Sequence, residues 1–415
     1  MTINATTRSS EALAALAARA PRRSDARPIP RSAAVICALL EKMSSGSLEI
    51  ELPDGSRRSF GQGAPCAALV VKEWSVFDDA LRRGDIGFAE GWIDGRWTCD
   101  SLAALLGLLV VNRRDLEAAV YGTWWGQLFD RLRHLLRINT RAGSRRNIHA
   151  HYDLGNDFYR LWLDQGMTYS SAWFEGEADR SLEAAQDAKN RRLLDQLALA
   201  PGASVLEIGC GWGGFAEAAA ARGLHVTGLT LSTEQLAFAR ERLGRVALGQ
   251  AQFVLRDYRD EPGVYDGIAS VEMFEAVGER YWPAWFATVA RCLRPGGRAV
   301  IQTITIDDAL FERYRRGTDF IQQYVFPGGM LPTRSRFEAL ARGAGLEVRE
   351  QLAFGPDYAR TLRMWRERFM AVLDPVRALG FDDRFIRTWE FYLAYCEAAF
   401  QHGNTDVVQF TLERR

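Results

Sequence analysis

Histidine and cysteine are scarce in this chain, and neither occurs in a pattern that binds metal. There are five histidines and six cysteines in 415 residues, and no two cysteines form a C-x-x-C pair. Only His149 and His151 lie close together, so we expect no metal site. The cysteines are Cys37, Cys66, Cys99, Cys210, Cys292 and Cys396. Scattered thiols of this kind are typical of reduced, cytosolic proteins.

Long apolar runs and an excess of one charge are also missing. The longest apolar run, residues 102–111, is too short to span a bilayer. Lys plus Arg and Asp plus Glu balance at 52 each, so no net charge favours a nucleic-acid partner. Glu11 and Arg19 interrupt the stretch that a signal peptide would need, and we therefore expect a mobile tail over residues 1–30. These features predict a soluble, cytoplasmic protein.

Two further segments precede the main body of the chain. Residues 31–115 contain alternating apolar stretches at 48–52 and 68–71 and a Pro-Asp-Gly turn at 53–55, which indicate a small mixed α/β domain. We interpret it as a packing or lipid-handling module, because it contains no catalytic constellation. Residues 116–150 form a basic, aromatic-rich connector. Its arginines are Arg131, Arg133, Arg137, Arg141, Arg145 and Arg146.

The connector allows two interpretations. An amphipathic helix rich in Trp and Arg can lie in a membrane interface and gain from anionic lipid. The alternative is a solvated helix whose tryptophans, Trp124 and Trp125, dock on the next domain. In the first case the protein associates peripherally with the inner face of the membrane.

From residue 151 to 415 strand and helix patterns alternate. Strands are predicted at 204–208, 225–231, 251–256, 265–271, 298–306, 346–354 and 406–413. Residues 293–297 (LRPGG) are predicted to form the turn before the fifth strand. Residues 232–235 (STEQ) are predicted to form a capping box at the start of a helix. This rhythm predicts a doubly wound α/β sheet with an antiparallel strand at its edge, and ligands at the carboxyl ends of the first strands.

A glycine-rich turn follows the first of these strands. Residues 205–215 read VLEIGCGWGGF, in which Glu207 precedes Gly209, Gly211 and Gly213. A buried strand followed by such a turn lets a nucleotide approach the backbone closely. Spacing alone would also fit a dinucleotide, because Gly209, Gly211 and Gly214 match G-x-G-x-x-G. The next strand end, residues 228–232 (GLTLS), lacks the acid expected for an NAD ribose, which favours S-adenosylmethionine.

Five blocks between residues 151 and 410 resemble the cyclopropane fatty acid synthases and mycolic acid methyltransferases. The blocks lie at 151–159 (HYDLGNDFY), 167–174 (MTYSSAWF), 270–278 (SVEMFEAVG), 320–332 (FIQQYVFPGGMLP) and 357–362 (DYARTL), and the helix at 392–400 and strand at 406–410 continue the resemblance. The N-terminal segment is similar to the small domain of the phospholipid-modifying bacterial branch. The resemblance implies a Rossmann-like, class I S-adenosylmethionine-dependent methyltransferase domain with seven strands.

The resemblance also implies the reaction. In this family the methyl group of S-adenosylmethionine goes to a carbon–carbon double bond of an acyl chain, and the resulting cation must be sheltered from water. The aromatic residues Tyr169, Trp173, Phe174, Phe274, Tyr324 and Phe326 are candidates to face that cation, although most aromatics in such a domain are core. Ring closure gives a cyclopropane, and proton loss from a neighbouring carbon gives a methyl-branched olefin; both outcomes stay open.

Family enzymes hold a bicarbonate ion as the base, and the resemblance places its ligands at Ser171, Glu275, Gln302, the Ile304 backbone and Tyr358. Glu275 and Tyr358 keep the family residue. Ser171 replaces the usual cysteine and Gln302 the usual histidine, while Ala276 replaces a histidine often found after the glutamate. Ser and Gln can still donate hydrogen bonds, but an imidazole that titrates is gone.

The same resemblance assigns the cofactor contacts. Tyr169 and Ser170 are expected at the methionine end, with Glu207 facing its ammonium group and the glycine turn beneath. The adenosine side is expected to contact Thr230, Leu231, Gln235, Asp257 and Tyr258. For Asp257 a cap on the following turn is the alternative. Cys396 matches a cysteine often described as active in the family, but no basic neighbour in sequence would lower its pKa, so a buried structural thiol is the alternative.

Two other functions compete with lipid methylation. One is methylation of oxygen or nitrogen in a small apolar molecule, which would need a base beside a polar pocket. The other is a lipid-binding protein with a decayed site, suggested by Ser171 and Gln302 but opposed by the intact Glu275 and Tyr358. The expected partners are unsaturated phospholipid chains and the membrane surface, and phospholipid-modifying relatives suggest a homodimer.

Overall fold

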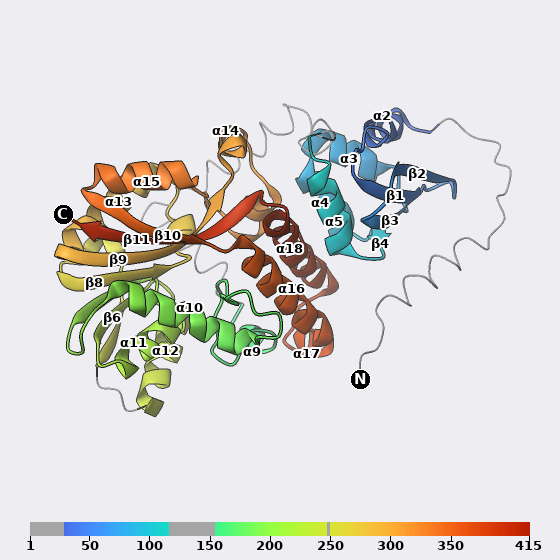
Figure 1. Cartoon of the computed structure of the whole chain (residues 1–415). Coiled ribbons are helices and arrows are strands. Elements are labelled where there is room, and N and C mark those ends of the chain that lie inside the picture. Colours follow the sequence, from blue (N-terminus) through green and yellow to red (C-terminus); the bar gives the residue numbers. More distant parts are fainter. Residues whose placement is uncertain (1–28, 115, 117–153, 247–249) are drawn as a thin grey trace.

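The computed structural model describes residues 29–114, 116, 154–246 and 250–415. Nearly all of the expected tail (1–30) and connector (116–150), including the six connector arginines, lies outside these residues. The described part contains one sheet of four strands and one of seven. Figure 1 shows the two sheets at opposite ends of the molecule, with the helices α16 (Gly355–Ala371) and α18 (Asp383–Gln401) between them.

The smaller sheet follows the alternating patterns of the N-terminal segment. Its strands are β1 (Gly46–Glu51), β2 (Arg57–Gln62), β3 (Cys66–Val71) and β4 (Trp97–Cys99), in the order β2-β1-β3-β4. Its helices are α2 (Arg31–Leu40), α3 (Ser75–Arg83), α4 (Asp85–Ile93) and α5 (Leu102–Val111). Buried and half-exposed residues alternate along β1, because successive side chains point to opposite faces of a strand. The predicted turn at 53–55 joins β1 to β2.

The larger sheet confirms the predicted seven-stranded α/β fold. Its strands are β5 (Ser204–Ile208), β6 (His225–Thr230), β7 (Ala251–Leu255), β8 (Tyr265–Val271), β9 (Leu293–Ile306), β10 (Leu346–Ala353) and β11 (Thr405–Arg414). Their order is β10-β11-β9-β8-β5-β6-β7. The strands β5, β6, β7, β8 and β9 run parallel to one another, so their carboxyl ends meet at one edge of the sheet.

Helices cover both faces of this sheet. Val205 packs in one apolar cluster with helices α10, α11 and α12, whereas Leu206 packs in another with α13 and α15. Because neighbouring residues of a strand point to opposite faces, these two clusters lie on the two sides of the sheet. The helices are α10 (Leu182–Leu197), α11 (Gly214–Ala221), α12 (Thr233–Val246), α13 (Trp282–Cys292) and α15 (Arg334–Gly343). At the start of α12, the hydroxyl of Ser232 accepts a hydrogen bond from the Gln235 backbone N–H, as its cap role requires.

Two details of the sheet differ from the prediction. The antiparallel strand β11 lies inside the sheet, between β9 and β10, and not at its edge. Residues 407–412 are all buried, as an inner strand requires, whereas the edge strand β10 exposes Arg349. Residues 293–297, expected as a turn, are the irregular beginning of β9. There Gly297 allows close approach, since a Cβ would lie 2.8 Å from the Asp266 carbonyl oxygen.

The N-terminal part packs against helix α18. Nε1 of Trp92 donates to the Arg387 carbonyl at 3.1 Å, and the Arg387 guanidinium donates to the Trp92 carbonyl at 3.0 Å. The guanidinium also lies 5.2 Å from the Trp92 ring centroid, within the range of a cation–π contact. A single apolar cluster extends from Ala33 in α2 to Val407 in β11. The two parts therefore share a continuous core.

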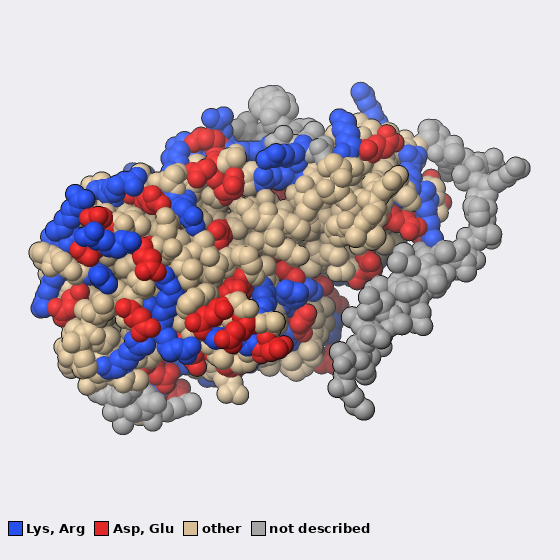
Figure 2. All heavy atoms as spheres, viewed as in Figure 1, with Lys and Arg blue, Asp and Glu red and all other residues tan. Residues whose placement is uncertain are grey.

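No helix in the described ranges is long and apolar enough to cross a membrane. Figure 2 shows acidic and basic side chains interspersed over much of the visible face, around a broad area of uncharged residues in its middle.

Candidate active site

A cavity of about 180 Å³ lies at the carboxyl ends of the parallel strands. The turns after β5, β6, β7 and β8 all contribute to its wall, together with residues 167–170 and helix α10. Ten of the expected cofactor residues line it: Tyr169, Ser170, Glu207, Gly209, Gly211, Thr230, Leu231, Gln235, Asp257 and Tyr258. The fold thus brings together expected cofactor residues that lie up to 89 positions apart in the sequence.

The three glycines of the turn after β5 have different roles. Gly209 and Gly211 have positive φ angles of 85° and 51°, which L-residues with a side chain rarely adopt. A Cβ on Gly211 would meet no atom within 4 Å, so this backbone lies open to the cavity. A Cβ on Gly213 would instead lie 3.0 Å from Phe253 and 3.2 Å from Ala239. Gly213 therefore serves close packing against β7 and α12 and does not line the cavity.

The methionine end of the expected cofactor has a fitting counterpart in Glu207. This carboxylate is buried, and its Oε2 has no hydrogen-bond partner among the described residues. Burial raises the pKa of Glu207 well above its usual value, and the charges of Arg242 and Lys189 oppose that shift. A buried acceptor without a partner is costly unless a ligand supplies the donor, and the ammonium group of S-adenosylmethionine would do so.

Lys189 is a residue of this site that sequence reasoning missed. It lies in α10, lines the cavity, and donates from Nζ to Ser170 Oγ at 2.7 Å and to Gln186 Oε1 at 2.6 Å. Burial lowers the pKa of Lys189 to about 8, against the opposing charges of Glu272, Asp164 and Glu207. Nothing in the local sequence marks it, because lysines are common in helices and its burial arises from the tertiary fold.

The adenosine side is formed by the ends of β6 and β7. The hydroxyl of Thr230 donates to Gln235 Oε1 at 3.1 Å, which fixes two of the expected contacts. Asp257 lines the cavity and also caps the following turn, since its Oδ1 accepts from the Arg259 backbone N–H at 3.0 Å. Its Oδ2 accepts from the Arg259 guanidinium at 2.5 Å. The alternative role of Asp257, a turn cap, is thus present in the structure, and an adenine contact would be additional to it.

Glu272, immediately after β8, is a residue of this site that the sequence analysis did not predict. Its Oε1 accepts from the Ser171 backbone N–H at 2.8 Å and from Gln302 Nε2 at 2.7 Å. Its Oε2 accepts from the Tyr358 hydroxyl at 2.7 Å. Glu272 also lines the cofactor cavity. Burial raises the pKa of Glu272, and the three donors and the charge of Lys189 oppose the shift.

The backbone of Glu272 is as unusual as its side chain. Its φ of 49° lies in the left-handed region, where a residue with a Cβ is strained. The surrounding structure must hold it there, and such strain is concentrated at functional sites. A sequence signal existed, because Glu272 follows the carboxyl end of a central strand and precedes Glu275 by three positions. The family resemblance, however, covers residues 270–278 as a whole and assigns no role to Glu272.

Glu275, the acid expected at the base site, lies beside Glu272. Its Oε1 accepts from the backbone N–H of Ile304 and from the Thr303 hydroxyl, the latter at 2.9 Å. Its Oε2 has no partner among the described residues. Burial and the neighbouring charge of Glu272 raise the pKa of Glu275 to about 8. Two acidic groups therefore share one buried site, and burial raises the pKa of both.

These contacts decide how a bicarbonate ion would fit. The expected donors Ser171, Gln302 and Tyr358 already face the carboxylate of Glu272, and the Ile304 N–H faces that of Glu275. An external anion at this position would have to displace the bound carboxylate of Glu272 and would lie beside the acidic group of Glu275. The described residues do not fit a bicarbonate ion.

Cys396 and five of the six aromatic candidates lie outside the cofactor cavity. Cys396 lies in α18, and burial, with the charge of Asp319, raises the pKa of its thiol. Phe274 is fully buried against Trp285 and Phe337, and the hydroxyl of Tyr324 donates to Glu90 at 2.5 Å. Of the six aromatic candidates, Tyr169 alone lines the cofactor cavity, and its hydroxyl lies 2.7 Å from that of Tyr392.

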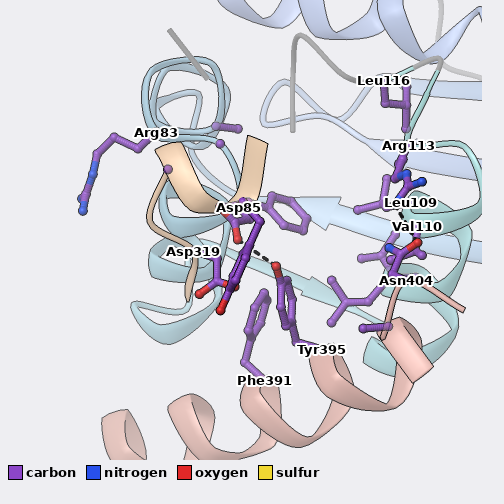
Figure 3. Close-up of a pocket in the computed structure, with 18 of the residues that line it drawn as sticks. Arg83, Asp85, Leu109, Val110, Arg113, Leu116, Asp319, Phe391, Tyr395 and Asn404 are labelled. Atoms are coloured by element: carbon purple, nitrogen blue, oxygen red, sulfur yellow. Dashed lines mark hydrogen bonds between the residues drawn. The ribbon is translucent and has the colours of Figure 1, made fainter. Parts of the chain in front are cut away.

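A second and larger cavity, of about 460 Å³, lies between the N-terminal part and helix α18 (Figure 3). Most of the described residues that line it are apolar, and they include Leu109, Val110 and Phe391. Asp85, at the start of α4, is directed into it and accepts from the Tyr395 hydroxyl at 2.9 Å. Burial and the charge of Asp319 raise the pKa of Asp85 to about 7.

Comparison with known proteins shows that the chain is similar to one family of lipid-modifying enzymes. The model of the mycolic acid cyclopropane synthetase family matches residues 139–410. The tuberculostearic acid methyltransferase UfaA1 of Mycobacterium tuberculosis is 39% identical over 93% of this chain and 93% of its own length. The cyclopropane-fatty-acyl-phospholipid synthase of Escherichia coli is 35% identical over 85% of this chain and 89% of its own length. The crystal structure of mycolic acid cyclopropane synthase CmaA1 with SAH and CTAB has a TM-score of 0.62 at 33% identity, over 65% of this chain and 98% of that chain.

Proposed function

The chain belongs to the mycolic acid cyclopropane synthetase family, and from this premise we propose that it methylates a double-bond carbon of a phospholipid-bound acyl chain and gives a methyl-branched product. The family as a whole consists of S-adenosylmethionine-dependent enzymes that methylate or cyclopropanate unsaturated fatty acyl chains. The form of the substrate and the fate of the cation are the parts that the proposal adds.

The N-terminal part of the chain supports the proposal that the substrate is a phospholipid. The alignment with the phospholipid synthase covers 366 residues, which is longer than the stretch from residue 139 to the C-terminus, so it includes part of residues 31–115. The mycolic acid enzyme CmaA1 covers only 65% of this chain, although nearly all of that enzyme is matched. The domain that this chain shares with a phospholipid-modifying enzyme supports the same substrate class.

Two observations favour the methyl-branched product. The relative that covers 93% of this chain is named a methyltransferase. In addition, Ser171 and Gln302 stand at the base site in place of the residues expected from the family resemblance, and Glu272 enters the same site. A base of different shape and position can take its proton from a different carbon, which decides between ring closure and a retained double bond.

The residues of the cavity have distinct tasks in this reaction. When bound, S-adenosylmethionine supplies an electrophilic methyl group. Glu207 would accept from its ammonium group and Lys189 would pair with its carboxylate, which fixes the sulfonium centre in the cavity. Gly211 leaves its backbone open to the ligand. The half-buried Tyr169 and the buried Tyr358 keep water away from the cation that forms on the acyl chain.

The test is an incubation with labelled S-adenosylmethionine and vesicles of a monounsaturated phospholipid. Products are resolved by proton NMR, because a cyclopropane and a methyl-branched olefin have the same mass. A methylated chain that retains its olefin signal is the expected result, and upfield ring protons would contradict the branched product. The same fatty acid offered unesterified is the matched control, and faster methylation of this free acid would contradict the phospholipid substrate.

A further inference from the structure

We propose that the carboxylate of Glu272 is the proton acceptor of this reaction and takes the place of an external bicarbonate ion. The inference rests on the proposed function, because the proton to be removed arises only when a methyl group adds to an alkene. It assigns a catalytic role to a residue of the chain itself and removes the need for a dissolved anion.

The hydrogen bonds of Glu272 are those of a bound oxyanion. Donors from three separate parts of the fold converge on it: the Ser171 N–H before α10, Gln302 Nε2 from β9 and the Tyr358 hydroxyl from α16. Gln302 is held in turn, because its Oε1 accepts from Gln409 Nε2 at 2.9 Å. Donors fixed in this way keep the carboxylate at the wall of the cofactor cavity, where the reaction takes place.

The charges around Glu272 decide which of the two neighbouring acids is ionised. Lys189 of α10 faces it as a cation, Tyr358 of α16 faces it as a neutral donor, and Glu275 follows it in the short helix η2 (Phe274–Ala276). Glu275 accepts two hydrogen bonds and Glu272 accepts three, and the pKa of Glu275 is about 8. Glu275 therefore retains its proton near neutral pH, whereas the three donors and the charge of Lys189 favour the ionised form of Glu272, the form that can accept a proton.

The reaction balances with Glu272 as the base. The π electron pair of the alkene forms a bond to the methyl carbon as the bond from that carbon to sulfur breaks, and a neutral thioether leaves. One alkene carbon is then a cation. A C–H bond next to the cation breaks, its electron pair forms the new double bond, and its proton goes to the carboxylate of Glu272. The neutral acid later returns this proton to water.

The strained backbone provides a matched pair of variants. Glu272→Gly removes the carboxylate, relieves a φ of 49° that only glycine adopts freely, and leaves three converging donors. Glu272→Gln fills the same space, accepts from Ser171 and Gln302 and donates to the Tyr358 oxygen, but it is not basic. Glu272→Gln keeps an acceptor for Ser171 and Gln302, and glycine eases the strained turn, so both variants are expected to fold.

The experiment measures methylated lipid in buffer freed of carbon dioxide and again after bicarbonate is added. Wild type is expected to have the same rate in both. Glu272→Gln is expected to lose at least about a hundredfold in kcat in both, the usual scale for a lost general base. Glu272→Gly is expected to lose as much without bicarbonate and to recover activity with it. Glu338→Gln, an acid on the outer helix α15, is the control and keeps the wild-type rate.

A second readout does not depend on turnover. Binding of ¹³C-bicarbonate, followed by broadening of its NMR line, is expected for Glu272→Gly and absent for wild type and Glu272→Gln. A wild-type enzyme that binds bicarbonate and stops without it would overturn the inference, as would full activity of Glu272→Gln. If wild type makes no methylated lipid under any condition, the proposed function itself is wrong, and that result is distinct from both.

Discussion

At the scale of single residues, the buried carboxylate of Glu207 is the clearest candidate to bind the cofactor's ammonium group. Its Oε2 has no hydrogen-bond partner among the described residues, so the folded chain carries a desolvation cost that a ligand cation can offset. We expect Glu207→Gln to weaken binding of S-adenosylhomocysteine by about 10- to 100-fold, the scale of one hydrogen bond to a charged group. Calorimetric titration measures the dissociation constant.

Thermal unfolding provides the control for this variant. The unliganded Glu207→Gln protein should be at least as stable as wild type, because a neutral amide is less costly to bury than a charge. Glu338→Gln, in α15 and outside the cofactor cavity, should bind the ligand as wild type does. Unchanged affinity in Glu207→Gln would show that the ammonium group lies elsewhere.

Tyr358 tests the ionisation of Glu272. Its hydroxyl donates to Glu272 Oε2 at 2.7 Å and so stabilises the charged form of that carboxylate. In Tyr358→Phe the pKa of Glu272 should rise, and the acidic limb of the kcat/KM profile should move to higher pH by about one pH unit, the equivalent of one hydrogen bond of ~1.4 kcal/mol. The ring is retained and still packs 4.4 Å from that of Phe400.

The matched control is Tyr265→Phe, which removes a tyrosine-to-carboxylate hydrogen bond of 2.9 Å to Glu261 outside the cavity. Its pH profile should coincide with that of wild type. A profile of Tyr358→Phe that also coincides would mean that Glu272 does not titrate in the catalytic cycle.

The sequence could predict single residues only where a local motif carries them. Glu207 and the glycine turn are contiguous, so their roles follow from spacing next to a buried strand. Glu272 has its role because Ser171 and Tyr358, 101 and 86 positions away, converge on it in the fold. No local pattern records such a convergence, and Lys189 was missed for the same reason.

At the scale of elements, the contact between α4 and α18 contains a titratable group. Asp85 accepts from Tyr395 and from the Phe320 N–H, and its pKa in the folded protein is about 7 because of burial and the charge of Asp319. Between pH 3.8 and 7 the folded state therefore binds more protons than the unfolded chain, whose aspartate has the usual pKa. The free energy of unfolding should fall as pH rises through this window, by at most about 1.4 kcal/mol per pH unit for this group.

Asp85→Asn should remove this slope. We expect its free energy of unfolding, measured by denaturant titration at pH 5, 6 and 7, to decline less steeply than that of wild type. Asp374→Asn is the control, because the Asp374 side chain is 97% exposed. Parallel curves for wild type and Asp85→Asn would contradict the assignment of this buried acid.

The elements themselves were largely predictable. All seven strands of the larger sheet were identified, because apolar runs bounded by turn residues mark buried strands. The position of β11 was not, since strand order depends on pairing between distant segments. A signal was nevertheless present: residues 407–412 are apolar or uncharged on both faces, which fits an inner strand, whereas β10 carries Glu347, Arg349 and Glu350.

At the scale of the whole molecule, the proposed phospholipid substrate raises the question of how its acyl chain reaches the cofactor cavity. That cavity lies in the α/β domain, and no described helix is long and apolar enough to cross a membrane. Equal numbers of acidic and basic residues mean that attraction to an anionic surface has to be local. The six connector arginines are the strongest local excess in the sequence, although they lie outside the described residues.

We therefore expect that replacing Arg131, Arg133, Arg137, Arg141, Arg145 and Arg146 by glutamine will weaken binding to anionic phospholipid vesicles by at least a hundredfold. An arginine near such a surface contributes about 1 kcal/mol, and salt screens the attraction within about 8 Å at physiological ionic strength. Co-sedimentation with vesicles at low and high salt measures both effects. The control replaces six paired surface arginines, Arg222, Arg294, Arg342, Arg349, Arg377 and Arg415. If the connector variant binds vesicles with unchanged affinity and salt dependence, the connector is not the membrane contact, and its tryptophans dock on the protein instead.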